Sequence, residues 1–144
     1  MRNRNLLQRV VILILITASF IACNVLSAAP AKPKAGATLV GTIAMDRAKS
    51  AQITLKVSDD GQTIEWVSVA FTELKCEGFS AGSSSTMVTG YVPILDGKFE
   101  FKSSDIGEIS GQFKSPTAVQ GTVHLAFFDG KAECGTWEWS ATGN

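Results

Sequence analysis

Apolar and polar residues alternate with a period of two along several stretches of the chain beyond residue 50. Between Gln52 and Val57, every second residue is aliphatic and the residues between them are polar. This period is typical of a β-strand with one face in the protein interior. Residues 109–114 and 119–127 repeat the pattern, so we expect three half-buried strands here.

The same alternation predicts which side chains point inward, because neighbouring residues of a strand face opposite sides of the sheet. We expect an interior set made of Ile53, Leu55, Val57, Val123, Leu125 and Phe127. The solvent-facing set is expected to be Gln52, Thr54, Lys56, Thr122 and His124.

Three further stretches carry more local signals. Residues 64–71 are rich in β-branched and aromatic residues, but the alternation slips at Trp66, which predicts a bulge or burial on both faces. Residues 88–94 contain Pro93, so this strand should be an edge strand or end there. Residues 76–85 are rich in glycine and serine and predict a long, mobile connection.

Asp-Gly pairs at 60–61, 96–97 and 129–130 predict turns between these strands, and residues 136–141 form a closing strand. About eight strands without a convincing helix indicate an all-β fold, either a sandwich or a barrel. We favour a single antiparallel β-sandwich over residues 38–144, a length usual for one domain.

The N-terminus has a different pattern, with three arginines before an apolar run of thirteen residues, 10–22. The run is shorter than the roughly 20 residues that span a membrane and fits the core of an export signal. Residues 19–23 resemble the lipobox of bacterial lipoproteins, which implies that residues 1–22 are removed and that Cys23 carries a lipid. Cleavage after Ser27 or Ala28 with simple secretion, or an uncleaved anchor, are the alternatives.

Small residues, prolines and lysines follow Cys23, so residues 23–37 predict a lipidated cysteine on a flexible tether. Beyond residue 38 there are 13 acidic and 8 basic residues, a net charge of 8 − 13 = −5. An acidic domain repels phosphate backbones, so we expect no nucleic-acid partner. The expected partners are a membrane, through the lipid, and an envelope or extracellular ligand.

Cys76 and Cys134 are the cysteines left once Cys23 is lipidated or removed. An even pair in an oxidising compartment predicts a disulfide. Free thiols are the alternative. A metal site is disfavoured, because two thiols and one distant histidine lack ligand spacing, and we expect no cofactor.

Several of these features occur together in one arrangement. A turn follows the strand at 53–57, Gly121-Thr122 lies in a late strand, each half of the domain has a cysteine, and Trp137-Glu-Trp139 closes the chain. This arrangement resembles a loose group of uncharacterised exported bacterial β-domains. The resemblance implies fold and location, and it implies no activity.

Gly78-Phe-Ser-Ala-Gly82 matches the nucleophile elbow G-x-S-x-G, with Asp96 or Asp105 and then His124 following in hydrolase order. An elbow needs a strand before it and a helix after it, and the sequence predicts no such helix. We therefore interpret the pentapeptide as part of a flexible loop and expect no catalytic residues.

His124 lies on the polar side of its strand, where a solvated surface residue is the simplest interpretation. Asp59 and Asp60 could bind calcium, but Asp-Asp-Gly is more typical of a turn. We therefore expect no metal site here.

Trp137 and Trp139 share one face of their strand. If this face is inward they belong to the core, and if it is outward they form a possible ligand contact for a glycan or a protein. The sequence therefore favours a non-enzymatic, lipid-anchored binding or structural module outside the cytoplasm. A secreted hydrolase and a carbohydrate-binding domain are the alternatives.

Overall fold

The computed structural model describes residues 29–104, 106–128 and 130–144, and in this part of the chain the regular elements are eight β-strands. Their bounds are β1 Thr38–Ile43, β2 Ser50–Val57, β3 Thr63–Cys76, β4 Phe79–Pro93, β5 Lys98–Ser103, β6 Gly107–Ser115, β7 Ala118–Phe127 and β8 Ala132–Thr142. All pairings between them are antiparallel, which confirms an all-β fold of about eight strands.

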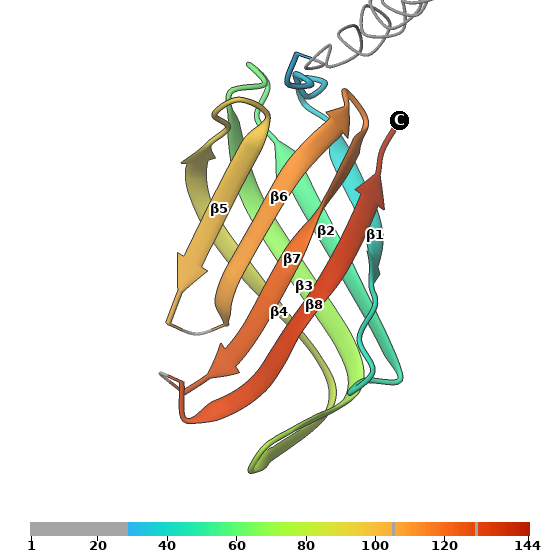
Figure 1. Cartoon of the computed structure of the whole chain (residues 1–144), viewed down its shortest axis with the longest axis vertical. Helices are drawn as coiled ribbons and strands as arrows, with labels where there is room; N and C mark the ends of the chain where they lie inside the picture. Colours follow the sequence, from blue (N-terminus) through green and yellow to red (C-terminus); the bar gives the residue numbers. More distant parts are fainter. Residues whose placement is uncertain (1–28, 105, 129) are drawn as a thin grey trace, which may run out of the picture.

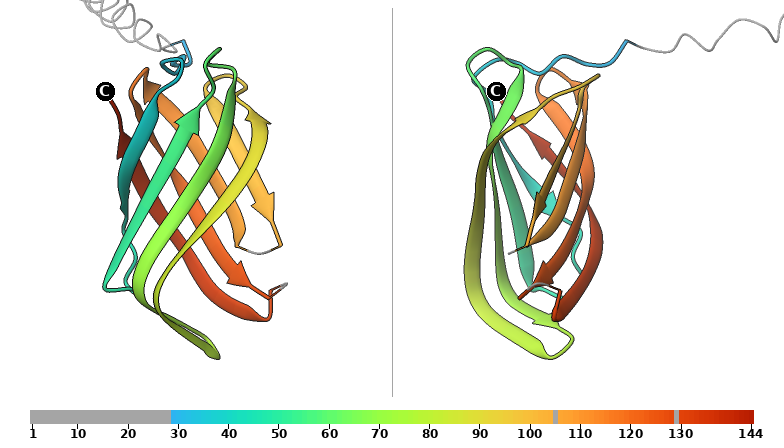
Figure 2. Two further views of the ribbon diagram at one scale, coloured as in Figure 1. Left: turned by 180° about the vertical axis from the view of Figure 1, so that it is seen from behind. Right: turned by 90° about the vertical axis from the view of Figure 1, so that its left-hand side faces the viewer.

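The strands form one sheet in the order β4-β3-β2-β1-β8-β7-β6-β5. Two four-stranded meanders are joined where the first strand pairs with the last, Gly41 opposite Ala141. The sheet curls until its two edge strands approach each other at one end, which gives a nearly closed, barrel-like shape (Figure 1, Figure 2). The sandwich form is not confirmed, because the β1–β8 ladder makes one continuous sheet of what would have been two.

The interior holds the side chains that the alternation predicted. Five of the six expected residues are at most 1% exposed, and Phe127 is half-buried near the end of β7. In the polar set, Gln52 and Thr122 are exposed, whereas Thr54, Lys56 and His124 are partly covered. The predicted irregularity near Trp66 is a shift in the β3–β4 register between Ile64 and Trp66.

The expected mobile connection at 76–85 is wrong. Cys76 pairs with Phe79 across a tight turn, and β4 then pairs with β3 as far as Thr63 opposite Pro93. Serine and glycine can adopt an extended backbone. Hydrogen bonds to β3 hold residues 79–85 as a strand, which their composition did not predict. Pro93 is the last residue of β4, an edge strand, as predicted.

The predicted turn at Asp96-Gly97 is confirmed, since Leu95 and Lys98 exchange two backbone hydrogen bonds of 2.9 Å. Both central residues have positive φ, 51° for Asp96 and 71° for Gly97, a combination for which Asp-Gly is favoured. The flanking strands β4 and β5 nevertheless lie at opposite ends of the strand order and do not form a ladder.

The segment before β1 covers one end of the sheet. Lys34 N donates to Pro116 O at 2.8 Å, Gly36 N donates to Ser58 O at 2.9 Å, and Pro33 and Ala37 are buried. Packed structure therefore begins before residue 38, and the part of the expected tether at 33–37 lies against the turns at this end. The remainder of the tether up to residue 28 is outside the described residues.

The opposite end is closed by the predicted disulfide between Cys76 at the end of β3 and Cys134 in β8. Beside it, Phe79 packs on Phe127 and Phe128, with ring centroids 5.6 and 5.4 Å apart, and Phe71 packs on Phe127 at 6.2 Å. The long β3–β4 hairpin is thereby fixed to the β7–β8 hairpin. Across the described residues, we find no helix with the length and apolar character needed to traverse a membrane.

Candidate functional site

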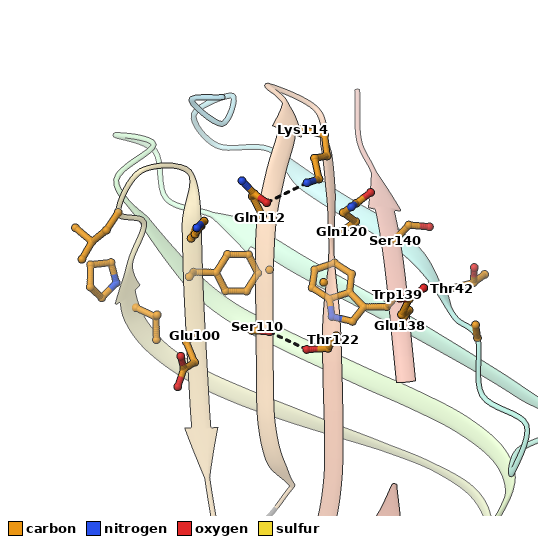
Figure 3. A pocket seen from close by; sticks show the side chains of 18 residues that line it. Thr42, Glu100, Ser110, Gln112, Lys114, Gln120, Thr122, Glu138, Trp139 and Ser140 are labelled. Atoms are coloured by element: carbon orange, nitrogen blue, oxygen red, sulfur yellow. Dashed lines mark hydrogen bonds between the residues drawn. The ribbon is translucent and has the colours of Figure 1, made fainter. Parts of the chain in front are cut away.

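An open groove of about 950 Å³ lies on the sheet where β1, β8, β7, β6 and β5 run side by side. We call it the outer groove, because most of its side chains come from the outward positions of these strands (Figure 3). It is lined by Thr42, Ala44, Val92, Pro93, Leu95, Lys98, Phe99, Glu100, Ser110, Gly111, Gln112, Lys114, Gln120, Gly121, Thr122, Glu138, Trp139 and Ser140.

The strand register arranges these polar side chains in two rows across the sheet. The first row is Glu100, Ser110, Thr122 and Glu138, each opposite the next on neighbouring strands. The second row is Lys98, Gln112, Gln120, Ser140 and Thr42. Because outward residues two apart in sequence belong to adjacent rows, five separate strands build one continuous polar surface.

Between the two rows, the chain carries residues whose side chains point into the core. Gly111 and Gly121 lie opposite each other, and Trp139 lies opposite Gly121. A Cβ at Gly111 would come within 2.5 Å of the Phe99 ring and 3.0 Å of the Trp139 ring. Glycine at this position therefore lets Phe99 and Trp139 pack beneath the groove, with ring centroids 6.3 Å apart.

Hydrogen bonds occupy only part of the polar capacity of the groove. The hydroxyls of Ser110 and Thr122 are 2.9 Å apart, and Lys114 Nζ donates to Gln112 Oε1 at 3.0 Å (Figure 3). Within the described residues, the side chains of Gln120, Glu138 and Ser140 have no such partner. Hydroxyl, amide and carboxylate groups are thus available to an incoming ligand.

A charged row borders the groove at Glu100. Lys102 Nζ lies 2.5 Å from Glu100 Oε1 and 3.5 Å from Glu108 Oε2. The hydrogen bond and charge of Glu100, followed by the charge of Glu108, raise the pKa of Lys102 above its ordinary value. One lysine is therefore shared by two carboxylates at this border of the groove.

The two candidate tryptophans have different environments. Trp139 is 3% exposed, and its Nε1 is buried without a hydrogen-bond partner among the described residues. Trp137 is half-buried, and its Nε1 donates to Asp46 Oδ1 at 2.7 Å. This bond is the largest cause of a lowered pKa at Asp46. Both rings share the inward face, so Trp139 supports the groove from below and offers no exposed aromatic platform.

His124 lies on the outer face of β7, outside the groove. Its Nδ1 is 3.0 Å from Thr136 Oγ1, and its Nε2 is 3.4 Å from Glu133 Oε1. Ser80 lies on β4 opposite Lys75, and Asp96 lies in the turn beyond the other end of β4. Gly78–Gly82 therefore forms a hairpin turn and the start of a strand, without the helix of a nucleophile elbow, and Asp105 lies outside the described residues.

Asp60 stabilises the turn after β2 through hydrogen bonds. Its Oδ1 accepts hydrogen bonds from Ser58 Oγ at 2.6 Å and from Gln62 N at 2.9 Å. These bonds, the one from Ser58 first, lower the pKa of the Asp60 carboxyl. No group of three or more histidine, cysteine or acidic side chains that could hold a metal occurs among the described residues. Cys23, the predicted lipidation site, lies outside them.

No protein-family model matches the sequence, and no curated protein matches it either. The likeness to exported bacterial β-domains therefore stays a prediction.

Sequence reasoning missed the outer groove, although the signal was present in part. Ser110, Gln112, Gln120 and Thr122 occupy polar positions in strands that the alternation predicted. Their meeting depends on the register of β6 with β7 and of β7 with β8, which the alternation leaves open.

Proposed function

We propose that the protein is a non-enzymatic binding module that works outside the cytoplasm, held to the cell envelope by a lipid on Cys23. The outer groove is its ligand site, and the ligand is a hydroxyl-rich molecule of the carbohydrate class. The observation that carries this proposal is the double row of polar side chains over five strands.

The chemistry of the rows supports this ligand class. Gln112 and Gln120 lie directly opposite each other on β6 and β7, and each amide offers both donors and an acceptor. Glu100 and Glu138 stand at the two ends of the first row as acceptors. Neighbouring hydroxyls of a sugar present alternating donors and acceptors, which such a mixed surface can satisfy.

The location rests on the sequence and on the cysteines. An arginine-rich start, an apolar run of thirteen residues and Cys23 resemble a lipoprotein signal. The Cys76–Cys134 disulfide is typical of an oxidising compartment. A lipid on Cys23 would hold the domain at the membrane surface through the residues that precede the packed segment 33–37.

Lipid attachment is tested by labelling. Cells that express the full chain should incorporate labelled palmitate into it, and Cys23→Ser should abolish both the label and signal removal. A mature N-terminus beyond Cys23, or a wild-type chain without label, would contradict the lipid anchor.

Ligand binding is tested by probing the exported protein, extracted in detergent, against an array of bacterial and host glycans. Gln120→Ala should weaken binding of any retained glycan by roughly 5- to 10-fold, since one hydrogen bond contributes about 1–1.5 kcal/mol. Ser80→Ala is the control, because Ser80 is an exposed residue of β4 outside the groove and outside its two polar rows. Equal losses in the two variants, or no retained glycan, would contradict the proposal.

A further inference from the structure

Strand β4 is an unusual edge strand. It spans fifteen residues, Phe79–Pro93, and contains no aspartate, glutamate, lysine, arginine or histidine. It stands at one end of the strand order, so only β3 pairs with it. Half of its backbone donors and acceptors therefore face away from the sheet, as a template for another strand.

The edge is most accessible along the half of β4 that is distant from β5. Near the Asp96-Gly97 turn the two edge strands are close, and Gly90 lies against the Phe101 ring. Further along, β4 and β5 diverge (Figure 1, Figure 2). The three serines at 83–85 are exposed, as are Ser80 and Gly82, whereas Phe79 at the start of the strand packs on Phe127 and Phe128.

Edge strands of monomeric proteins are usually protected by lysines, prolines, bulges or short length. Here the accessible half has none of these, since Pro93 is at the far end and the register shift of β3 lies near the same end. Met87, with 61% of its surface exposed, points outward next to the serines. The edge has the features of a strand that is covered in the working protein.

We infer that a second copy of this chain covers it, through antiparallel pairing of β4 with β4 of the other copy around a two-fold axis near Ser84. Two-fold pairing sets the uncharged stretch against itself, so no charged side chain of β4 becomes buried. The domain as a whole has 13 acidic and 8 basic residues beyond residue 38. Because each copy has a net negative charge, a contact along a stretch without charged side chains keeps the repulsion between the two copies low.

Analytical ultracentrifugation of the full exported chain in detergent, over a range of concentrations, measures the equilibrium between monomer and dimer. The wild type should form a dimer. Ser84→Lys places two lysines side by side at the axis and should raise the dimer dissociation constant at least tenfold, and Ser84→Glu should do the same. An equal mixture of the two variants should recover the dimer, because lysine then meets glutamate.

Gln52→Lys is the control, since it adds the same charge on an exposed position of β2 and should leave the dimer unchanged. Circular dichroism checks that each variant is folded. A monomeric wild type, including one that binds an added extended peptide, would overturn the inference. A dimer that persists unchanged in both Ser84 variants, or a mixture that stays monomeric, would also overturn it. Ser84 lies outside the lining of the groove, so glycan binding by the two Ser84 variants reports separately on the proposed function.

Discussion

At the scale of single residues, the fold depends on where small side chains allow large ones to pack. Gly111 lies between the rings of Phe99 and Trp139, and these rings form the layer beneath the outer groove. In the alternating stretch 109–114, residue 111 shares a strand face with Ile109 and Phe113. The alternation did not predict that two aromatic rings from β5 and β8 fill the space beside it.

Gly111→Ala should lower the free energy of unfolding by about 1–3 kcal/mol, as overpacking of a core does. The reason is the 2.5 Å approach of a new Cβ to Phe99. Gly82→Ala is the control, because a Cβ there meets nothing within 4 Å. Urea denaturation of the two variants measures the difference, and equal stabilities would contradict the packing described for Gly111.

Leu125→Ala should cost about 2–5 kcal/mol of unfolding free energy, since a buried leucine leaves a cavity. Leu125 is 1% exposed, whereas its neighbour His124 lies on the outer face. His124→Ala should cost within about 0.5 kcal/mol, as at an ordinary surface position. A larger loss at His124 than at Leu125 would mean that the register of β7 is wrong.

The hydrogen bond between Trp137 and Asp46 predicts a signal in acid. The lowered pKa of Asp46 favours its carboxylate in the folded protein, so the stabilising effect is present above the ordinary value of 3.8 and is lost as pH falls through the lowered pKa. Tryptophan fluorescence should therefore change in this acidic range. Asp46→Asn should remove this transition, and an unchanged titration would contradict the assignment.

At the scale of elements, local pattern predicted most strands but not how they pair. Period-two alternation located the inward residues of β2 and β7, and Pro93 identified an edge strand. The ladder between β1 and β8 was not predictable, because alternation carries no information on which strands meet. The start of β4 was not predicted as a strand, because a composition rich in serine and glycine is typical of a loop. Hydrogen bonds to β3 hold this segment in the sheet.

The disulfide ties two of these elements, β3 and β8, whose cysteines are 58 residues apart in the sequence. Replacing both with serine should lower the unfolding free energy by roughly 4 kcal/mol, mainly through greater freedom of the unfolded chain. Thermal unfolding of wild type and variant measures this loss. Mass spectrometry of a non-reduced digest should show the linked peptides, and full alkylation without reductant would contradict the pairing.

At the scale of the whole molecule, the curled sheet has two faces with different roles. The interior is filled by aliphatic and aromatic side chains, while the outer face of β1 and β5–β8 has two polar rows. The groove could not be predicted from the sequence, because its two polar rows come from five strands and converge only through register. We propose that this surface binds a hydroxyl-rich ligand and that the uncharged edge of β4 pairs with a second copy.

The most direct test of the central claim is to map ligand contacts by nuclear magnetic resonance on the ¹⁵N-labelled mature protein. Titration with a glycan retained on the array should shift the amide signals of Ser110, Gln120 and Ser140 in a saturable manner. Signals of Ser68 and Thr72, on β3 and away from the groove, should stay in place. Shifts confined to β2 and β3, or no saturable shift in the groove, would contradict the account.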